Sequence, residues 1–120
     1  MKKYTQITLI IAVFFLFSFT LTSDQLLPTS LRITVLNELG NTETEVMVTL
    51  YGNNEDYKKE ENAVMEGKMT DKRGRVIFKG LAPKVYFVNA EKGDKNNYGA
   101  GVQTDTLQEG RVNKVNIIIE

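Results

Sequence analysis

The residues best suited to chemistry by type and spacing lie in a polar loop, Lys92–Gly99. Oxygen-bearing side chains recur there at Asp94, Asn96 and Asn97, and closely spaced oxygen ligands can hold calcium. Two lysines of the same loop oppose a cation, and the EF-hand pattern with its closing glutamate is missing. The loop therefore favours an ordinary turn, in which Asp and Asn side chains bond their own backbone. Whether it also binds an ion stays open.

A second candidate is a cluster of carboxylates. Glycosidase-type hydrolysis uses two acids that flank a cleft and whose environments separate their pKa values. In this sequence the acids are interleaved with lysines, which is typical of a solvated surface. A carboxylate- or metal-dependent hydrolase acting on an extracellular substrate is the alternative function. Its candidate acids are Glu55, Asp56, Glu60 and Glu61.

Aromatic residues offer a third kind of candidate, a surface that recognises a glycan or a peptide. Tyr57 and Tyr98 stand in polar loops, where a ring can meet a ligand, so they are the preferred recognition residues. Tyr86 is predicted to pack in the core or at a strand edge. Tyr51 and Phe87 complete the aromatic residues considered for such a surface.

The chain has 120 residues and contains neither cysteine nor histidine. Without cysteine there is no disulfide, no thiolate nucleophile and no zinc–thiolate site. Without histidine the side chain most often used for proton transfer near neutral pH is missing, as is the commonest transition-metal ligand. The sequence therefore predicts no catalytic residue, no cofactor and no metal site, and the protein is expected not to be an enzyme.

Residues 1–23 are predicted to be a signal peptide. Lys2 and Lys3 form a basic start, an apolar run covers residues 7–21, and no acidic residue occurs before Asp24. The run is shorter than the roughly 20 residues that a spanning helix needs. No clear small-residue cleavage motif ends it, so an uncleaved N-terminal anchor is the competing interpretation.

Export without cysteine suggests a bacterial protein of the periplasm, the cell surface or the extracellular space, because secreted eukaryotic domains of this size usually carry disulfides. The chain has fifteen basic and fifteen acidic residues, and two of the basic ones belong to the signal. Charge this balanced gives no sign of nucleic acid or an anionic membrane as a partner. The expected partner is an envelope protein, a peptide or a glycan, with a membrane only if the N-terminal segment stays uncleaved.

After a linker at residues 24–29, residues 30–120 are predicted to form one domain. Apolar residues recur at every second position, which is typical of strands with one buried face, and turn residues separate the runs. This pattern predicts an all-β, seven-stranded antiparallel β-sandwich. The predicted extended runs are Leu31–Val35, Val46–Tyr51, Val64–Thr70, Arg75–Lys79, Val85–Ala90, Gly99–Val102 and Val112–Glu120.

The same alternation predicts which side chains share a face of each strand. Leu81 is expected to plug the end of the core. The charged stretch at residues 55–62 is expected to be a solvated excursion, or one or two helical turns capped by Asn54. The residues placed on the apolar face of their strands are Leu31, Ile33, Val35, Val46, Val48, Leu50, Val76, Phe78, Tyr86, Val88, Ala90, Val115, Ile117 and Ile119.

An ordered set of short motifs resembles the carboxypeptidase regulatory-like domain, a transthyretin-like (prealbumin-like), Ig-like sandwich found in small exported proteins of Bacteroidetes-type bacteria. Family members run a strand, a glycine turn, a second strand, and a Thr-Asp-x-x-Gly turn that leads to Phe-x-x-Leu. The resemblance implies a spacer, folding support or binding module without catalytic activity. The matching pieces are Val35-Leu-Asn-Glu-Leu-Gly40, Val46-Met-Val-Thr-Leu-Tyr51, Thr70-Asp-Lys-Arg-Gly74, Val76-Ile-Phe78 with Gly80-Leu81, and Tyr86-Phe-Val88.

Two related sandwich families are a poorer match. The transthyretin-like hydrolases of purine breakdown use histidines and a C-terminal Tyr-Arg-Gly-Ser, whereas this chain has no histidine and ends in Ile-Ile-Ile-Glu. Cna-B-type sandwiches cross-link a lysine to an asparagine, and the first predicted strand here offers Arg32 instead of a lysine.

The favoured function is therefore an exported, non-enzymatic binding or scaffolding module of the cell envelope. A further possibility concerns the last predicted strand, Val112–Glu120, which could be extended by a partner strand.

Overall fold

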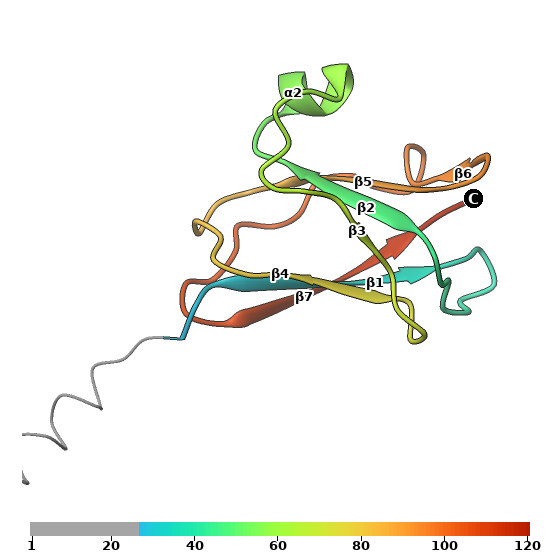
Figure 1. The fold of residues 1–120 in the computed structure, drawn as a ribbon, viewed down its shortest axis with the longest axis horizontal. Coiled ribbons are helices and arrows are strands. Elements are labelled where there is room, and N and C mark those ends of the chain that lie inside the picture. Colours follow the sequence, from blue (N-terminus) through green and yellow to red (C-terminus); the bar gives the residue numbers. More distant parts are fainter. Residues whose placement is uncertain (1–26) are drawn as a thin grey trace, which may run out of the picture.

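The computed structural model describes residues 27–120, which form two facing β-sheets (Figure 1). The predicted signal peptide and residues 24–26 of the predicted linker lie outside the described residues. Thr29, the last residue of that linker, is buried, and its Oγ1 accepts a hydrogen bond from Gly110 N over 2.9 Å. Between Leu27 and the C-terminus, no helix has the length and hydropathy of a membrane span.

The first sheet has the strand order β4-β1-β7. Its strands are β1 (Ser30–Leu36), β4 (Arg75–Phe78) and β7 (Val112–Ile118). β1 is antiparallel to β4 but parallel to β7, so the prediction of a wholly antiparallel sandwich is wrong for this pair. The cause is where β7 begins: Ser30 N donates to Arg111 O, and Asn113 Nδ2 donates to Ser30 O, so both strands start at the same end. Alternation reports which face is buried and carries no information on strand direction.

The second sheet has the order β3-β2-β5-β6, and its pairs are all antiparallel. Its strands are β2 (Met47–Tyr51), β3 (Lys68–Met69), β5 (Phe87–Lys92) and β6 (Lys95–Asn96). The described residues thus hold seven strands, the number predicted, but not the same seven. The run predicted from residue 64 to 70 pairs only at its end, as β3. The predicted strand at residues 99–102 does not form, since residues 98–100 are a turn, and β6 lies instead in the loop predicted to be a turn.

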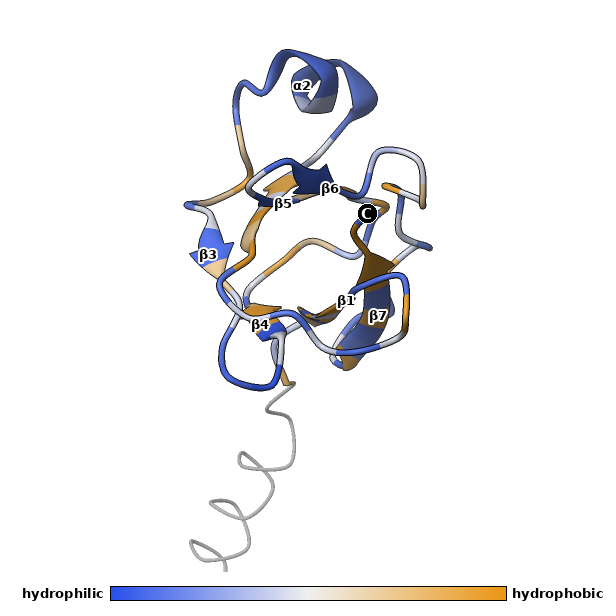
Figure 2. Cartoon of the chain, turned by 90° about the vertical axis from the view of Figure 1, so that its right-hand side faces the viewer, coloured by the Kyte–Doolittle hydropathy of each residue, from blue (hydrophilic) through white to orange (hydrophobic). Residues whose placement is uncertain are grey.

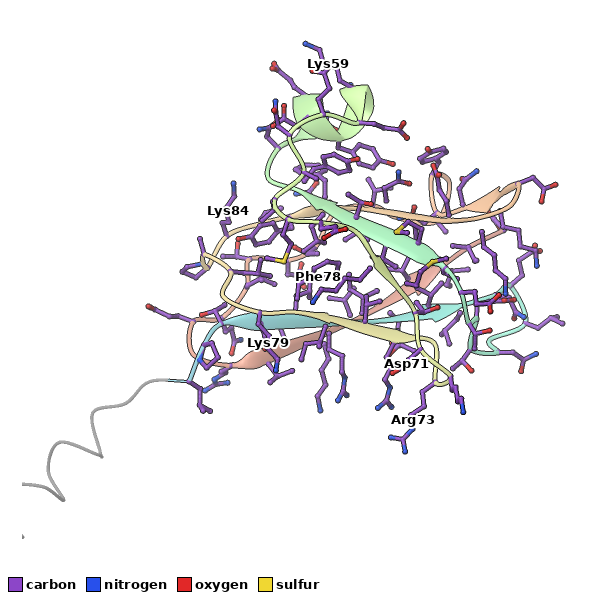
Figure 3. All side chains as sticks on the ribbon, in the orientation of Figure 1. Lys59, Asp71, Arg73, Phe78, Lys79 and Lys84 are labelled. Atoms are coloured by element: carbon purple, nitrogen blue, oxygen red, sulfur yellow. The ribbon has the colours of Figure 1, made fainter. Side chains whose placement is uncertain are left out.

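Side chains from both sheets fill the space between them, where Phe78 lies fully buried (Figure 3). The inward faces are apolar and the outer surface and α2 are mostly polar (Figure 2). Leu81 and Tyr86 join this core, which confirms both predictions. The core comprises Leu31, Ile33, Val35, Val46, Val48, Leu50, Val76, Phe78, Leu81, Tyr86, Val88, Ala90, Leu107, Ile117 and Ile119, with Val115 and Met65 packed against it.

Thr70 ties the β3–β4 connection to the start of β2. Its buried hydroxyl donates to Glu43 O over 2.8 Å and accepts from Val46 N over 3.0 Å. Asp71 then closes the turn, because its Oδ1 accepts from Arg73 N and Arg75 N. These backbone hydrogen bonds, led by the one from Arg75, lower the pKa of the Asp71 carboxyl. The Thr-Asp-x-x-Gly motif therefore acts as a structural turn.

Candidate functional site

The charged excursion after β2 contains one short helix, α2 (Asn54–Lys59). Asn53 caps it, because Asn53 Oδ1 accepts from Asp56 N over 2.8 Å. The predicted cap was Asn54, which is wrong by one residue. Glu60 ends the helix in a left-handed conformation. A helix this short, with none of its residues buried, needs a tertiary contact to hold its position.

Tyr57 supplies the contact between α2 and the second sheet. Its ring centroid lies 6.0 Å from that of Tyr51 on β2 and 6.2 Å from that of Phe87 on β5. Tyr51 and Phe87 are register partners on the outer face of the sheet. Edge-to-face and tilted pairs at these distances add stabilisation beyond simple burial. The excursion is therefore anchored on the outer face of the sheet by aromatic packing.

Tyr98 extends this cluster toward solvent. Its ring lies 6.4 Å from that of Tyr57 at an interplanar angle of 77°, and 53% of Tyr98 is exposed. The Tyr98 hydroxyl donates to Glu91 Oε1 over 2.8 Å, which raises the pKa of Tyr98 to about 12. We call Tyr51, Tyr57, Phe87 and Tyr98 the aromatic patch. The two tyrosines that the sequence singled out for recognition thus lie together, although 41 positions separate them.

Asn89 lies on the same outer face, between Phe87 and Glu91 along β5. It is 8% exposed, and its Nδ2 donates to Glu60 Oε1 over 3.4 Å. Its Oδ1 is buried without a hydrogen-bond partner among the described residues. Most buried amide oxygens have a partner, so this atom is an exception within the described residues. The sequence analysis missed Asn89 and Glu91, although alternation places both on the face of Phe87.

The predicted oxygen cluster of the Lys92–Gly99 loop is not assembled around a common point. Asn97 is fully buried, its Oδ1 accepts from Ala90 N over 3.0 Å, and its Nδ2 donates to Val88 O and Gly101 O. Asn96 Oδ1 accepts from Tyr98 N, and Asp94 is exposed. Asn96 therefore bonds the backbone of its own loop, as in the turn that the sequence favoured, whereas Asn97 mainly bonds the backbone of β5.

The predicted carboxylates also serve local structure. Asp56 accepts hydrogen bonds from the side chains of Asn53 and Asn62, and Glu60 accepts one from Asn89. Glu55 and Glu61 are exposed. Within residues 27–120, no three His, Cys, Asp or Glu side chains lie where they could hold a metal ion together.

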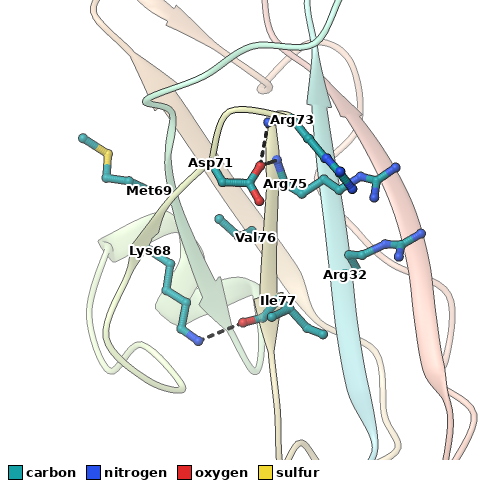
Figure 4. A pocket seen from close by; sticks show the side chains of 8 residues that line it. All are labelled: Arg32, Lys68, Met69, Asp71, Arg73, Arg75, Val76 and Ile77. Carbon is teal, nitrogen blue, oxygen red and sulfur yellow. Dashed lines mark hydrogen bonds between the residues drawn. The ribbon is translucent and has the colours of Figure 1, made fainter.

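Two surface clefts lie away from the aromatic patch. One, of about 380 Å³, is bordered by Arg32, Lys68, Arg73 and Arg75 between β3 and β4 (Figure 4). The other, of about 320 Å³, is bordered by the Asn37–Leu39 turn and Lys95.

Comparison with known proteins identifies no family for this fold and site. No protein-family model matches the chain, and no curated protein matches it. Twelve chains of solved structures match, among them one titled "The Bacillus anthracis TIE protein". That match has a TM-score of 0.47 and 15% sequence identity, and it covers 76% of this chain and 16% of the other.

Proposed function

We propose that this protein is an exported, non-enzymatic β-sandwich module of the cell envelope that binds a glycan or peptide at the aromatic patch. The observation that carries the proposal is the half-exposed ring of Tyr98, which packs against Tyr57 and is held by Glu91 through its hydroxyl. The alternating strands, the predicted signal and the motif series support an envelope protein of the carboxypeptidase regulatory-like, transthyretin-like type.

The aromatic patch suits sugar or peptide chemistry. The half-exposed ring of Tyr98 offers an apolar face that can pack against the C–H face of a sugar or an apolar side chain. Glu91 holds the Tyr98 hydroxyl and thereby limits the rotation of that ring. A few fixed polar groups beside an apolar surface are typical of small-ligand sites, and Glu60, Glu91 and Asn89 supply them here.

Binding to glycan and peptide arrays tests the proposal, with purified full-length protein as the probe. Tyr98→Ala should abolish or strongly weaken binding because it removes the exposed ring. Leu39→Ala is the matched control, since Leu39 is a large exposed residue on a distant turn, with 86% of its surface accessible. Binding that survives Tyr98→Ala, or that Leu39→Ala weakens equally, would contradict a role for the patch.

A further inference from the structure

The outer face of the first sheet carries positive charge from every strand. Arg32 on β1 and Arg75 on β4 point away from the core, because their chain neighbours are buried. Lys114 on β7 is exposed between two half-buried neighbours, of which Val115 packs against the core. Arg73 projects from the adjacent turn, and Figure 4 shows its side chain beside those of Arg75 and Arg32. We call Arg32, Arg73, Arg75 and Lys114 the basic face.

Little acidic charge balances this face. β1, β4 and β7 contain no aspartate or glutamate. Asp71, which borders the nearby cleft, is an acid close to the face; its Oδ1 accepts from the backbone of Arg73 and Arg75, and its charge also acts on both arginines. Among residues 27–120 the salt bridges all involve Glu43, which pairs with Lys92 and Lys95. No cation of the basic face therefore forms a salt bridge within this part of the chain, and Arg32 and Lys114 lie on strands without an acid.

Two of these cations lie directly opposite each other. Arg32 of β1 is the register partner of Lys114 of β7 in the parallel pair. Like charges directly opposite on neighbouring strands repel each other and destabilise a sheet. A bound anionic surface would relieve this repulsion, whereas water and salt only screen it.

The balanced charge of the whole chain conceals an uneven distribution. The opposite side of the sandwich has both signs of charge. Acids and lysines are interleaved there, on and after α2 and on β5: Glu55, Glu60, Glu61 and Glu91 lie among Lys58, Lys59 and Lys92. Figure 3 shows Lys59 on α2 and Arg73 at opposite ends of the molecule. An anionic surface would therefore orient the protein with the basic face inward and α2 outward.

We propose that the basic face docks on an anionic lipid bilayer. Exposed apolar side chains flank Lys114 along the edge strand of this face: Val112 is 49% exposed and Ile118 40% exposed, at the two ends of β7. Cations interleaved with apolar groups suit the boundary between lipid headgroups and acyl chains. Docking on this side leaves the aromatic patch facing away from the membrane, so both surfaces could be occupied together.

The position of the N-terminal sequence favours the bilayer over a soluble polyanion. The predicted apolar run ends at Leu21, and β1 of the same sheet begins at Ser30. The intervening eight residues span at most about 30 Å. As long as this run is uncleaved and inserted in a membrane, the basic face would therefore stay within reach of the lipid headgroups.

The test uses the full chain, which has no native cysteine to interfere with labelling. An environment-sensitive dye is attached through Asn116→Cys on the basic side of β7, or through Lys59→Cys on α2. Each labelled protein is reconstituted into phosphatidylcholine vesicles that carry a lipid-attached quencher, with or without phosphatidylglycerol. We expect quenching at position 116 only in the anionic vesicles, and none at position 59. Raising salt to about 1 M, where the Debye length is about 3 Å, should abolish it.

Arg32→Gln with Lys114→Gln should reduce the quenching in anionic vesicles to the level seen with phosphatidylcholine alone. This double variant should fold, because the two substitutions remove a contact between like charges. An unchanged or raised midpoint of thermal unfolding would verify that it folds. Lys58→Gln with Lys59→Gln removes the same charge from α2 and should leave the quenching intact. Equal quenching in both vesicle types, or quenching that survives the Arg32 and Lys114 changes, overturns the proposal. Binding of a soluble sulfated polysaccharide without bilayer quenching also overturns it and assigns the face to a polysaccharide.

Discussion

The side-chain oxygen of Asn97 accepts a hydrogen bond from Ala90 N over 3.0 Å, inside the core. The amide nitrogen of Asn97 donates to Val88 O, so one side chain pairs two backbone groups of β5. We expect Asn97→Ala to lower the free energy of unfolding by about 2–4 kcal/mol, because it leaves those buried groups unpaired. Chemical denaturation measures the change. Asp94→Ala, in the same loop but exposed, should stay within about 0.5 kcal/mol, and equal effects would refute the structural role of Asn97.

Thr70 offers a test of the bond between the β3–β4 connection and β2. Thr70→Val keeps the shape of the side chain but removes the hydroxyl that pairs with Val46 N and Glu43 O. We expect a loss of about 1–3 kcal/mol in unfolding free energy, since a buried N–H loses its partner. Thr70→Ser keeps the hydroxyl and should cost clearly less. If serine destabilises as much as valine, packing of the methyl group matters more than the hydrogen bonds.

Gly74 is required by the Asp71 turn for two reasons. Its φ is +72°, and a Cβ at this position would lie 2.9 Å from Thr42 Cβ and 3.1 Å from Glu43 N. Gly74→Ala should therefore cost more than the roughly 1–2 kcal/mol of left-handed backbone strain. Gly93→Ala is the control, because Gly93 has a φ of +61° but open space around it. Thermal unfolding should rank Gly74→Ala as the less stable variant, and the reverse order would contradict this contact.

The Tyr98 hydroxyl of the aromatic patch should ionise only at unusually high pH. The Glu91 carboxylate accepts a hydrogen bond from the neutral Tyr98 hydroxyl, which raises the pKa of Tyr98 from 10.0 to about 12. The stabilisation from this bond is complete below pH 10 and is lost as the pH rises toward 12. Tyr98→Phe should remove the last tyrosinate absorbance phase, and Glu91→Gln should move that phase to lower pH. An unchanged titration curve in Tyr98→Phe would show that another tyrosine is responsible.

The Glu43 carboxyl should make the free energy of unfolding depend on pH in the acid range. The pKa of Glu43 lies below its ordinary 4.5. The largest cause is the hydrogen bond from Lys92, and the second is the hydrogen bond from Asn37. The stabilisation is present above that ordinary value and is lost as the pH falls through the lower folded value. Denaturant unfolding of Glu43→Gln should therefore show a weaker loss of stability between neutral and acidic pH than the unmodified protein. Parallel acid profiles for the two proteins would contradict this role.

Much of the fold follows from local sequence pattern. The inward positions of Ile33, Phe78 and Val88 are predictable because the period of a strand puts every second side chain on one face. The turn at Asp71–Gly74 is predictable for the same local reason, since its residue types suit that backbone. The direction of β7 is different: parallel pairing with β1 depends on where a long connection brings the chain back, and residue alternation is the same for both directions.

The sequence by itself determined that apolar alternation builds an all-β core, because side-chain burial is a local property of each strand. Only the tertiary structure decided which surface residues meet. Tyr57 and Tyr98 pack together because α2 folds onto β5, and Arg32 faces Lys114 because β7 pairs beside β1. Total charge and residue spacing cannot report such contacts, since they depend on distances in space between residues far apart in the chain.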